Sequence, residues 1–391
     1  MKKEHLFRLV SILAGILVAI LMAEVGLTLI QGDPADGPLP PGLEDGLDRY
    51  LSKGPVFSMY DSNLGWSPLP NGVSPDGLYR YNSAGIRSAP NEYSTSPDPG
   101  VLRIALFGDS FTEGAEVTFE DTWGYQLQTG LRSKGINAEV LNFGVSAYGM
   151  DQAFLRWEKT GRHYLPDVVV FGFQSSNIKR NMNLFRGFLY SDSGVLFTKP
   201  RFVLESGQLR LINVPTVPPE QLVNTLKNME EWELAQYESF YTPTEPEPGV
   251  WRRSRLLSSL FPSPSQSQSE EVDLGGYSAR GEQGQLALAI INAFRKDVES
   301  TGGTFLVVHL PSKDTLRSSA AGNRLPYAGL LNAMREDNLV VDPADKLIER
   351  SRQSDLDSLF ASSHYSPEAN QTVAEVLGEA LLDQKAASEV P

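Results

Sequence analysis

LRIALFGDSFTEG, residues 102–114, is an apolar run that ends in a Gly-Asp-Ser turn. The apolar part is short and bounded by turn residues, so it predicts a buried β-strand. Two runs of the same kind follow, AEVLNF at 138–143 and DVVVFGF at 167–173. Between these strands, apolar residues at helical spacing predict helices at 121–135 and 150–161. Apolar strands that alternate with helices indicate a parallel sheet that is covered on both faces.

The alternation of strands and helices returns towards the C-terminus. There the apolar pattern predicts strands at 304–310 and 339–342 and helices at 283–300, 327–336 and 366–383. We therefore predict an α/β domain at 101–384, built on a doubly wound sheet of five parallel strands, and a short tail at 385–391.

Residues 185–275 interrupt this alternation and are predicted to form an insertion between the third and fourth strands. KPRFVLESGQLRLINVP, 199–215, predicts a β-hairpin with Ser-Gly at its turn. A polar helix is expected at about 219–240, and FPSPSQSQSEE, 261–271, has the composition of a mobile loop. The pattern does not decide between a lid and a partner surface as the purpose of the insertion.

The composition excludes several classes of function. The 391 residues include 48 acidic and 34 basic side chains, which gives a net charge of −14. An acidic chain repels phosphate backbones, so we do not expect it to bind nucleic acid. The absence of cysteine excludes disulfides, thiolate zinc sites and a cysteine nucleophile. The sequence implies neither a metal nor another cofactor.

The N-terminal segment, 1–31, predicts a transmembrane anchor. LVSILAGILVAILMA, 9–23, carries no charge, and the apolar run continues beyond Glu24 to Ile30. This length is sufficient to cross a bilayer. Positive charge in front of the run predicts a cytoplasmic N-terminus and an extracytoplasmic body, periplasmic or extracellular; the basic residues are Lys2, Lys3 and Arg8. A cleaved signal peptide is the rival interpretation.

Residues 32–100 are expected to connect this anchor to the main domain. From Gly32 to about Pro55 the chain is rich in Gly, Pro and Asp, which predicts an extended spacer. Residues 56–100 are mixed in composition and are expected to pack on the main domain. This packing, rather than a sugar-binding cleft, is the expected role of the aromatic residues Trp66, Tyr79 and Tyr81.

Three polar clusters follow the first three predicted strands, at 108–114, 142–149 and 174–177. Because ligands of open parallel sheets bind beyond the carboxyl ends of the strands, these clusters are expected to form one site. Ser110 comes directly after the first strand and precedes a helix-like stretch, so its hydroxyl can project into the crevice. A serine hydroxyl is a weak nucleophile and needs an adjacent base.

Histidine is the expected base for serine chemistry near neutral pH, and the chain has only four. His5 lies in the predicted membrane flank, and His163 precedes the third strand at the wrong edge of the sheet. His364 opens the last helix in a loop that returns over the crevice, so we predict that His364 is the base. His309, at the end of a strand on the correct edge, is the second choice.

Three groups could stabilise an oxyanion at this edge of the sheet. They are the backbone N–H of Ser110, the backbone N–H of Gly144 and the side chain of Asn177. Gly144 suits a close approach of the backbone because it has no side chain. Loss of one such donor typically lowers the rate by about 100- to 1000-fold.

These blocks resemble those of the SGNH (GDSL-like) hydrolases. GDSFTEG at 108–114 is similar to the nucleophile block, and Gly144 and Asn177 match the glycine and asparagine of the second and third blocks. SHYSPEANQTVAE, with His364, is similar to the closing block. The resemblance covers about 101–182 and 283–383. It implies a flavodoxin-like fold and the hydrolysis or transfer of acyl groups on esters, which are often O-acetyl groups of carbohydrates.

Two positions depart from the family pattern. The family usually places an aspartate two or three residues before the histidine, where this chain has Ser362 and Ala361. Ile178 follows Asn177 where the family usually has aspartate. The first departure matters more, because loss of the aspartate from a triad can lower turnover by about 10⁴-fold. A backbone carbonyl, Ser362 or Asp357 could orient the imidazole instead.

Each candidate residue also has a purely structural interpretation. Ser110 could cap a helix, and Asp109 is expected to hold the turn by local hydrogen bonds. Asn177 could cap a loop, Gly144 could permit a turn and His364 could cap the last helix. The acidic residues after the nucleophile, Glu113 and Glu116, are expected on a solvated face rather than as a glycosidase pair.

The sequence therefore predicts a serine esterase that acts on O-acyl or O-acetyl groups of an extracytoplasmic saccharide or lipid. An O-acetyltransferase on the same scaffold is one alternative, since the sequence does not show how water is excluded. A non-catalytic polysaccharide-binding or assembly protein is the second, favoured by Ala361 and Ile178. A flavin or nucleotide binder is the weakest, because no phosphate-cradling glycine loop is present.

Overall fold

The sheet of this protein has five parallel strands in the order β4-β3-β5-β8-β9. The computed structural model describes residues 2–31, 39–40, 42–191, 194–241, 278–352 and 355–388. The strands are β3 (Leu102–Gly108), β4 (Ala138–Asn142), β5 (Val168–Phe173), β8 (Thr304–His309) and β9 (Leu339–Val341). Chain order 2-1-3-4-5 is the flavodoxin-like order, so the predicted fold class and all five predicted strands are confirmed.

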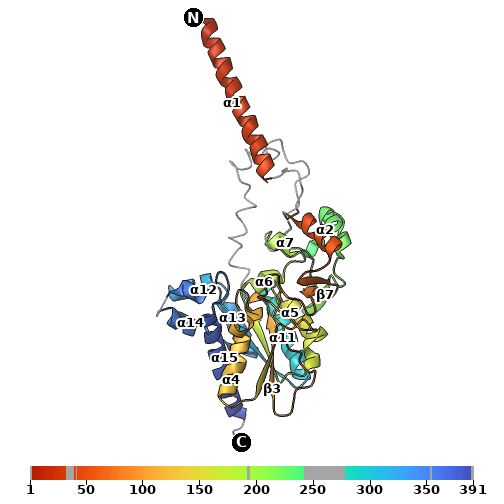
Figure 1. Ribbon diagram of the computed structural model, residues 1–391, viewed down its shortest axis with the longest axis vertical. Helices are drawn as coiled ribbons and strands as arrows, with labels where there is room; N and C mark the ends of the chain where they lie inside the picture. Colours follow the sequence, from red (N-terminus) through yellow and green to blue (C-terminus); the bar gives the residue numbers. More distant parts are fainter. Residues whose placement is uncertain are drawn as a thin grey trace.

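Helices cover both faces of the sheet, with β3 between the two layers (Figure 1). Alternate residues of each strand point to opposite faces. Thus Phe107 packs with Trp157 and Phe294 on one face, whereas Leu106 packs towards Trp123 and Leu377 on the other. The first layer contains α5 (Met150–Lys159), α11 (Glu282–Ser300) and α13 (Ala328–Asp337).

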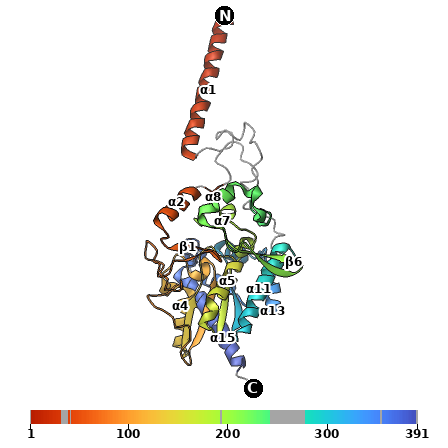
Figure 2. The same cartoon turned by 90° about the vertical axis from the view of Figure 1, so that its right-hand side faces the viewer.

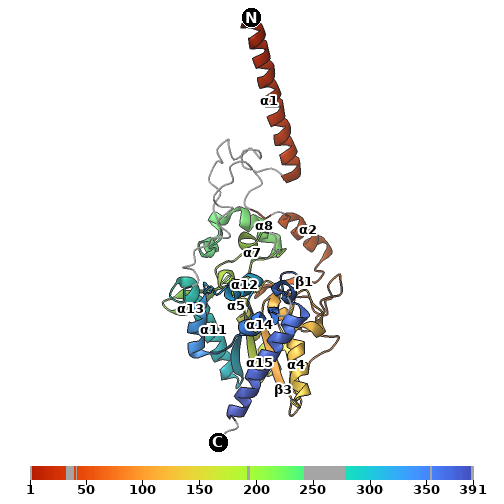
Figure 3. The ribbon, with the colours of Figure 1, turned by 90° about the vertical axis from the view of Figure 1, so that its left-hand side faces the viewer.

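The second layer contains α4 (Trp123–Ser133), α14 (Ala344–Ser351) and α15 (Pro367–Ser388). α4 and α15 lie side by side along the sheet (Figure 3). α4 begins where the Thr122 side chain accepts a hydrogen bond from the Tyr125 N–H, which is a typical N-cap. α15 continues to Ser388, into the segment that we predicted to be a tail.

The N-terminal part of the described chain is one helix, α1 (Lys2–Gln31), which stands apart from the α/β domain in Figure 1. In the portion that the structure describes, none of the helices combines the length and the hydropathy that a bilayer span requires. This finding does not support the predicted transmembrane anchor, which stays a prediction.

The segment that we expected to be an extended spacer contains a helix, α2 (Leu43–Lys53). This helix forms because Leu43 and Leu47 are four residues apart and both are buried against the insertion. Residues 58–68 form a small hairpin of β1 (Ser58–Asp61) and β2 (Gly65–Pro68), and Trp66 packs against Tyr148 of the main domain. The expected packing of the lead-in is thus confirmed.

The insertion contains the predicted hairpin, β6 (Arg201–Glu205) and β7 (Gln208–Ile212). The helix expected at 219–240 is shorter than predicted. α8 (Pro219–Lys227) ends at Lys227, and two 3₁₀ turns follow, at Met229–Glu231 and Glu233–Tyr237. The predicted mobile loop, 261–271, lies outside the described residues. α2, α7 (Arg186–Leu189) and α8 gather at one end of the domain, opposite the C-terminus of the chain (Figure 2).

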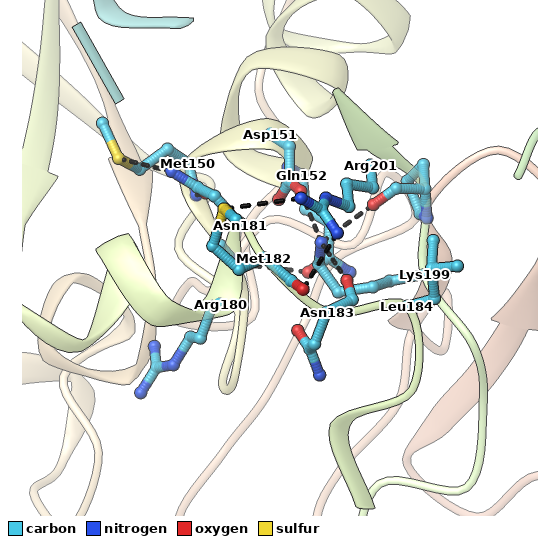
Figure 4. Close-up of polar contacts among 12 residues, drawn as sticks. Met150, Asp151, Gln152, Arg180, Asn181, Met182, Asn183, Leu184, Lys199 and Arg201 are labelled. Atoms are coloured by element: carbon cyan, nitrogen blue, oxygen red, sulfur yellow. Dashed lines mark hydrogen bonds and ion pairs between the residues drawn. The ribbon is translucent and has the colours of Figure 1, made fainter. Parts of the chain in front are cut away.

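A buried ion pair attaches this insertion to the sheet domain. The Lys199 ammonium group contacts the Asp151 carboxylate of α5, and both side chains are almost completely buried. Lys199 also donates to the carbonyl oxygen of Pro200 at 2.9 Å, and nearby Arg201 donates to the carbonyl oxygen of Met182 at 3.0 Å (Figure 4). Because buried charges are tolerated only when they are paired, this network fixes the insertion in one position.

Candidate active site

Ser110 and His364, which lie 254 residues apart in the chain, meet at the carboxyl end of β3. Ser110 is the first residue of the short helix α3 (Ser110–Glu113), directly after β3. The distance from Ser110 Oγ to His364 Nε2 is 2.8 Å, which is within hydrogen-bond range. The ring of Phe111 lies against the imidazole at 4.9 Å between centroids. The structure therefore brings the predicted nucleophile and the predicted base together.

Glu116 occupies the place of the aspartate that the sequence lacks before the histidine. Its Oε1 lies 2.9 Å from His364 Nδ1, on the opposite side of the ring from Ser110. Its Oε2 accepts from the backbone N–H groups of Ser362 at 2.8 Å and Ser363 at 3.0 Å, and the Ser363 hydroxyl donates to Oε1 at 2.8 Å. The carboxylate thus fixes both the imidazole and the loop that carries it.

Our expectation that Glu116 belongs to a solvated face is therefore wrong. Neither of the side chains that we proposed as substitutes takes this role. Asp357 is paired with Arg317 at 2.5 Å, and Ser362 contacts Glu116 through its backbone N–H.

The backbone of Glu116 is held in an unusual conformation. Its φ angle is +70°, a region that residues other than glycine seldom occupy and that is often found at functional sites. The fully buried Arg87 guanidinium donates to the carbonyl oxygens of Glu113 and Val117, each at 2.6 Å, and also to that of Gly114. The Glu116 N–H donates to the Tyr79 hydroxyl at 2.9 Å. The lead-in thereby positions the loop that presents the carboxylate.

Hydrogen bonding keeps Glu116 ionised. Burial alone would raise the pKa of its carboxyl group, but hydrogen bonds from His364 and Ser363 outweigh burial and lower the pKa to about 2. A carboxylate beside the imidazole favours the tautomer in which Nδ1 carries the proton, and this leaves Nε2 free to accept the proton of Ser110. The arrangement has the geometry of a Ser-His-Glu triad.

The lowered pKa of Glu116 predicts a pH-dependent contribution to stability. Its pKa in the folded state lies below the unfolded value, so the contribution is fully present above the unfolded pKa and is lost as the pH falls towards about 2. Urea unfolding at several pH values should show that Glu116→Gln destabilises the protein most near pH 7 and progressively less below about pH 4. Glu120→Gln, which removes an exposed carboxylate from the same segment, is the control. An equal effect of Glu116→Gln at all pH values would contradict this prediction.

The three predicted oxyanion donors lie at this edge, but two of them face protein acceptors. The Gly144 N–H donates to Asn142 Oδ1 at 2.9 Å. Asn177 Nδ2 donates to Asp109 Oδ2 at 3.1 Å and to the carbonyl oxygen of Tyr148 at 3.3 Å. Among the described residues, no acceptor is recorded for the Ser110 N–H. The Ser110 N–H is thus the donor that is available without rearrangement.

Gly144 is required by a close approach between two backbones. A Cβ atom at this position would lie 2.4 Å from the backbone nitrogen of Glu113, so no side chain fits. Asp109 holds the nucleophile turn, as expected, by accepting the Phe111 N–H at 3.0 Å. It is also paired with Arg180 at 2.7 Å, which the sequence did not indicate.

His309 belongs to a separate cluster. It is fully buried, and its ring nitrogens lie 2.9 Å from Asp342 Oδ1 and 3.1 Å from the Tyr327 hydroxyl. These contacts occupy both nitrogens, so His309 is not the partner of Ser110. Within the part of the chain that the structure describes, no group of three or more His, Asp or Glu side chains could hold a metal ion.

Comparisons with known proteins leave the family of this chain unassigned. No family model and no curated protein matches it. Among solved structures, an acetyl xylan esterase is 13% identical, with 71% of this chain and 99% of that chain covered and a TM-score of 0.37. A lipase/acylhydrolase from Enterococcus faecalis is 12% identical, with 72% and 96% covered and a TM-score of 0.37. A member of the lipolytic G-D-S-L family from Veillonella parvula is 11% identical, with 71% and 96% covered and a TM-score of 0.34. The function is therefore inferred from the geometry of the site.

Glu116 and Arg87 are the residues that sequence reasoning missed. A partial signal for Glu116 was present, because a histidine that lacks an acid before it can take a carboxylate from the segment that follows the nucleophile. Glu113 and Glu116 were the candidates there, and the buried Glu113 carboxylate accepts hydrogen bonds from Tyr81 and Ser146 instead. No signal in the sequence marked Arg87 as the residue that holds the loop.

Proposed function

We propose that this protein is a serine esterase in which Ser110, His364 and Glu116 form the catalytic triad. The observation that carries the proposal is the pair of contacts made by one imidazole, 2.8 Å to the Ser110 hydroxyl and 2.9 Å to the Glu116 carboxylate. A nucleophile, a base and a group that orients the base, in hydrogen-bond contact, constitute the arrangement that activates serine.

In the proposed reaction, Ser110 Oγ attacks the acyl carbon of an ester while His364 Nε2 accepts the hydroxyl proton. Glu116 stabilises the imidazolium that forms. The Ser110 N–H donates to the oxyanion, and Gly144 and Asn177 join it if they exchange their present acceptors. His364 then protonates the leaving alcohol. Water, activated by the same histidine, releases the acid from the acyl-enzyme.

The substrate class that we propose is an O-acyl or O-acetyl ester of an extracytoplasmic saccharide or lipid. A sugar hydroxyl in place of water would give acetyl transfer by the same residues, so the transferase alternative uses the same triad. The non-catalytic alternative was motivated mainly by the missing aspartate at 361 or 362, and Glu116 places a carboxylate at Nδ1 of His364 from a different segment of the chain.

We also propose that α1 anchors this enzyme with its N-terminus in the cytoplasm. The uncharged run at 9–23 and the basic residues before it support this location. The proposal requires the full chain to sediment with membranes and a chain that begins near residue 35 to stay in the supernatant.

Labelling with a fluorophosphonate tests the activation of Ser110 without knowledge of the substrate. Such probes react with a serine that an adjacent base activates. We expect mass spectrometry of the digested full-length protein to find the adduct on the peptide that contains Ser110. Ser110→Ala should abolish labelling, whereas Ser133→Ala, at an exposed serine that ends α4, should not. Labelling at another serine, or none in a folded protein, would overturn the proposed function.

A further inference from the structure

A cavity of about 680 Å³ lies next to the proposed catalytic helix. Its walls come from α2, from the β1–β2 hairpin, from residues 145–147 and from residues 194–197. Glu113, on the same short helix as Ser110, reaches its inner wall. The lead-in and the insertion thus build most of this cavity, which has the size of a typical small-molecule site.

The cavity wall is mainly apolar. Its lining includes Phe57, Trp66, Val145, Leu196 and Phe197. Trp66 and Phe197 are buried, and Phe197 packs edge-on against Tyr50 at 5.1 Å. A hydrocarbon chain that entered this space would exchange water for apolar contacts, which is favourable in proportion to the area buried.

The single acidic side chain in the described cavity lining is already occupied. Glu113 is 1% exposed, and its two carboxylate oxygens accept hydrogen bonds from the Tyr81 and Ser146 hydroxyls. Its carboxylate is therefore occupied by neighbouring hydroxyl groups of the cavity wall.

Two cations of α2 also line the cavity. Arg49 and Lys53 are four residues apart, so they lie on the same side of the helix, and both are exposed. Among the residues that the structure describes, neither forms an ion pair. The acidic residues of α2, Glu44, Asp45 and Asp48, do not line the cavity, so the two cations that line it form a local site for an anion.

We propose that this cavity binds an anionic amphiphile with a single hydrocarbon chain. The chain occupies the apolar interior between the β1–β2 hairpin and residues 194–197, and the anionic group lies at Arg49 and Lys53. Charge complementarity selects this occupant over a neutral or cationic amphiphile of the same length. Binding requires no acyl transfer at Ser110, so this binding site does not depend on the proposed esterase activity.

Photo-crosslinking to the full-length protein tests this proposal. The probe is dodecanoate with a diazirine at the end of its chain, and excess dodecanoate is the competitor. We expect adducts on peptides that contain residues 56–68 or 194–197, equally in Ser110→Ala. Dodecyltrimethylammonium, which has the same chain and the opposite charge, should compete poorly. Adducts only on other peptides would overturn the proposal.

Two variants separate the contribution of the head group from that of the chain. Arg49→Ala/Lys53→Ala should weaken competition by dodecanoate about tenfold, because it removes both cations that the carboxylate would contact. The control, Lys134→Ala/Lys296→Ala, removes two exposed cations elsewhere and should have no effect. Ser58→Trp, which places a large side chain in the cavity wall, should abolish the adducts in a protein with an unchanged circular dichroism spectrum. Labelling that none of these variants changes, or a cavity filled by a second copy or by another part of the chain, would contradict the proposal.

Discussion

Replacing Ser110 with alanine should reduce kcat/KM for p-nitrophenyl acetate by about 10⁴-fold or more. The substitution removes the only atom that can form the acyl-enzyme, while His364 and Glu116 keep their contact with each other. The remaining rate would come from the oxyanion donor and from water activated by the imidazole. The measurement is the initial rate with the full-length protein, corrected for spontaneous hydrolysis.

The control for this experiment is Ser133→Ala, at an exposed serine that ends α4 and makes no side-chain contact with the triad among the described residues. Its kcat/KM should stay within about twofold of the parent protein, as for most substitutions away from special features. Both variants should unfold at the same urea concentration as the parent. Equal turnover by the parent and by Ser110→Ala would eliminate Ser110 as the nucleophile.

The sheet could be predicted from the sequence because its strands are buried on both faces. Val168–Phe173 and Thr304–His309 contain continuous apolar runs, which are typical of parallel strands that are buried on both faces. The helices between them have one apolar face, so their apolar residues recur about every 3.6 residues, and this period can be read from a short stretch of sequence. The parallel arrangement followed from the alternation, since parallel neighbours need a crossover helix.

The elements that were missed or misjudged depend on distant contacts. α2 lies in a Gly- and Asp-rich stretch that suggests a spacer, and it is helical because Leu43 and Leu47 pack against residues of the insertion such as Leu222. α8 ends at Lys227, and the chain continues in two 3₁₀ turns that bring Trp232 against Val203 and Ile212 of the hairpin. The local sequence pattern gives no information about these distant contacts.

The candidate site likewise has a part that the sequence predicted and a part that depends on distant contacts. Ser110 follows a strand and His364 precedes a helix, so topology alone places both at one edge of the sheet. Glu116 reaches His364 only because the chain turns into the left-handed region after α3 and because Arg87 binds the carbonyl oxygens around the turn. A left-handed glutamate and a guanidinium from a different segment leave no periodic signal, so the sequence could offer Glu116 as a candidate but could not place it at His364.

Changing Glu116 to glutamine should lower kcat for p-nitrophenyl acetate by about 10⁴-fold and change KM little. Glutamine has nearly the same shape, so the loop can stay in place, but its amide can donate a hydrogen bond to His364 Nδ1. That bond stabilises the tautomer in which Nε2 carries the proton, and such a nitrogen cannot accept the proton of Ser110. The uncharged amide also fails to stabilise the imidazolium.

The matched control is Asp357→Asn, which tests the acid that the sequence suggested in place of Glu116. Asp357 pairs with Arg317 and Lys313 on the surface, so its loss should change kcat less than about twofold. Glu116→Asp retains the charge on a shorter side chain and should recover part of the activity that glutamine loses. If Asp357→Asn were the damaging change and Glu116→Gln the harmless one, the contact between Glu116 and His364 would have no catalytic role. The imidazole would then be oriented by Asp357 rather than by Glu116.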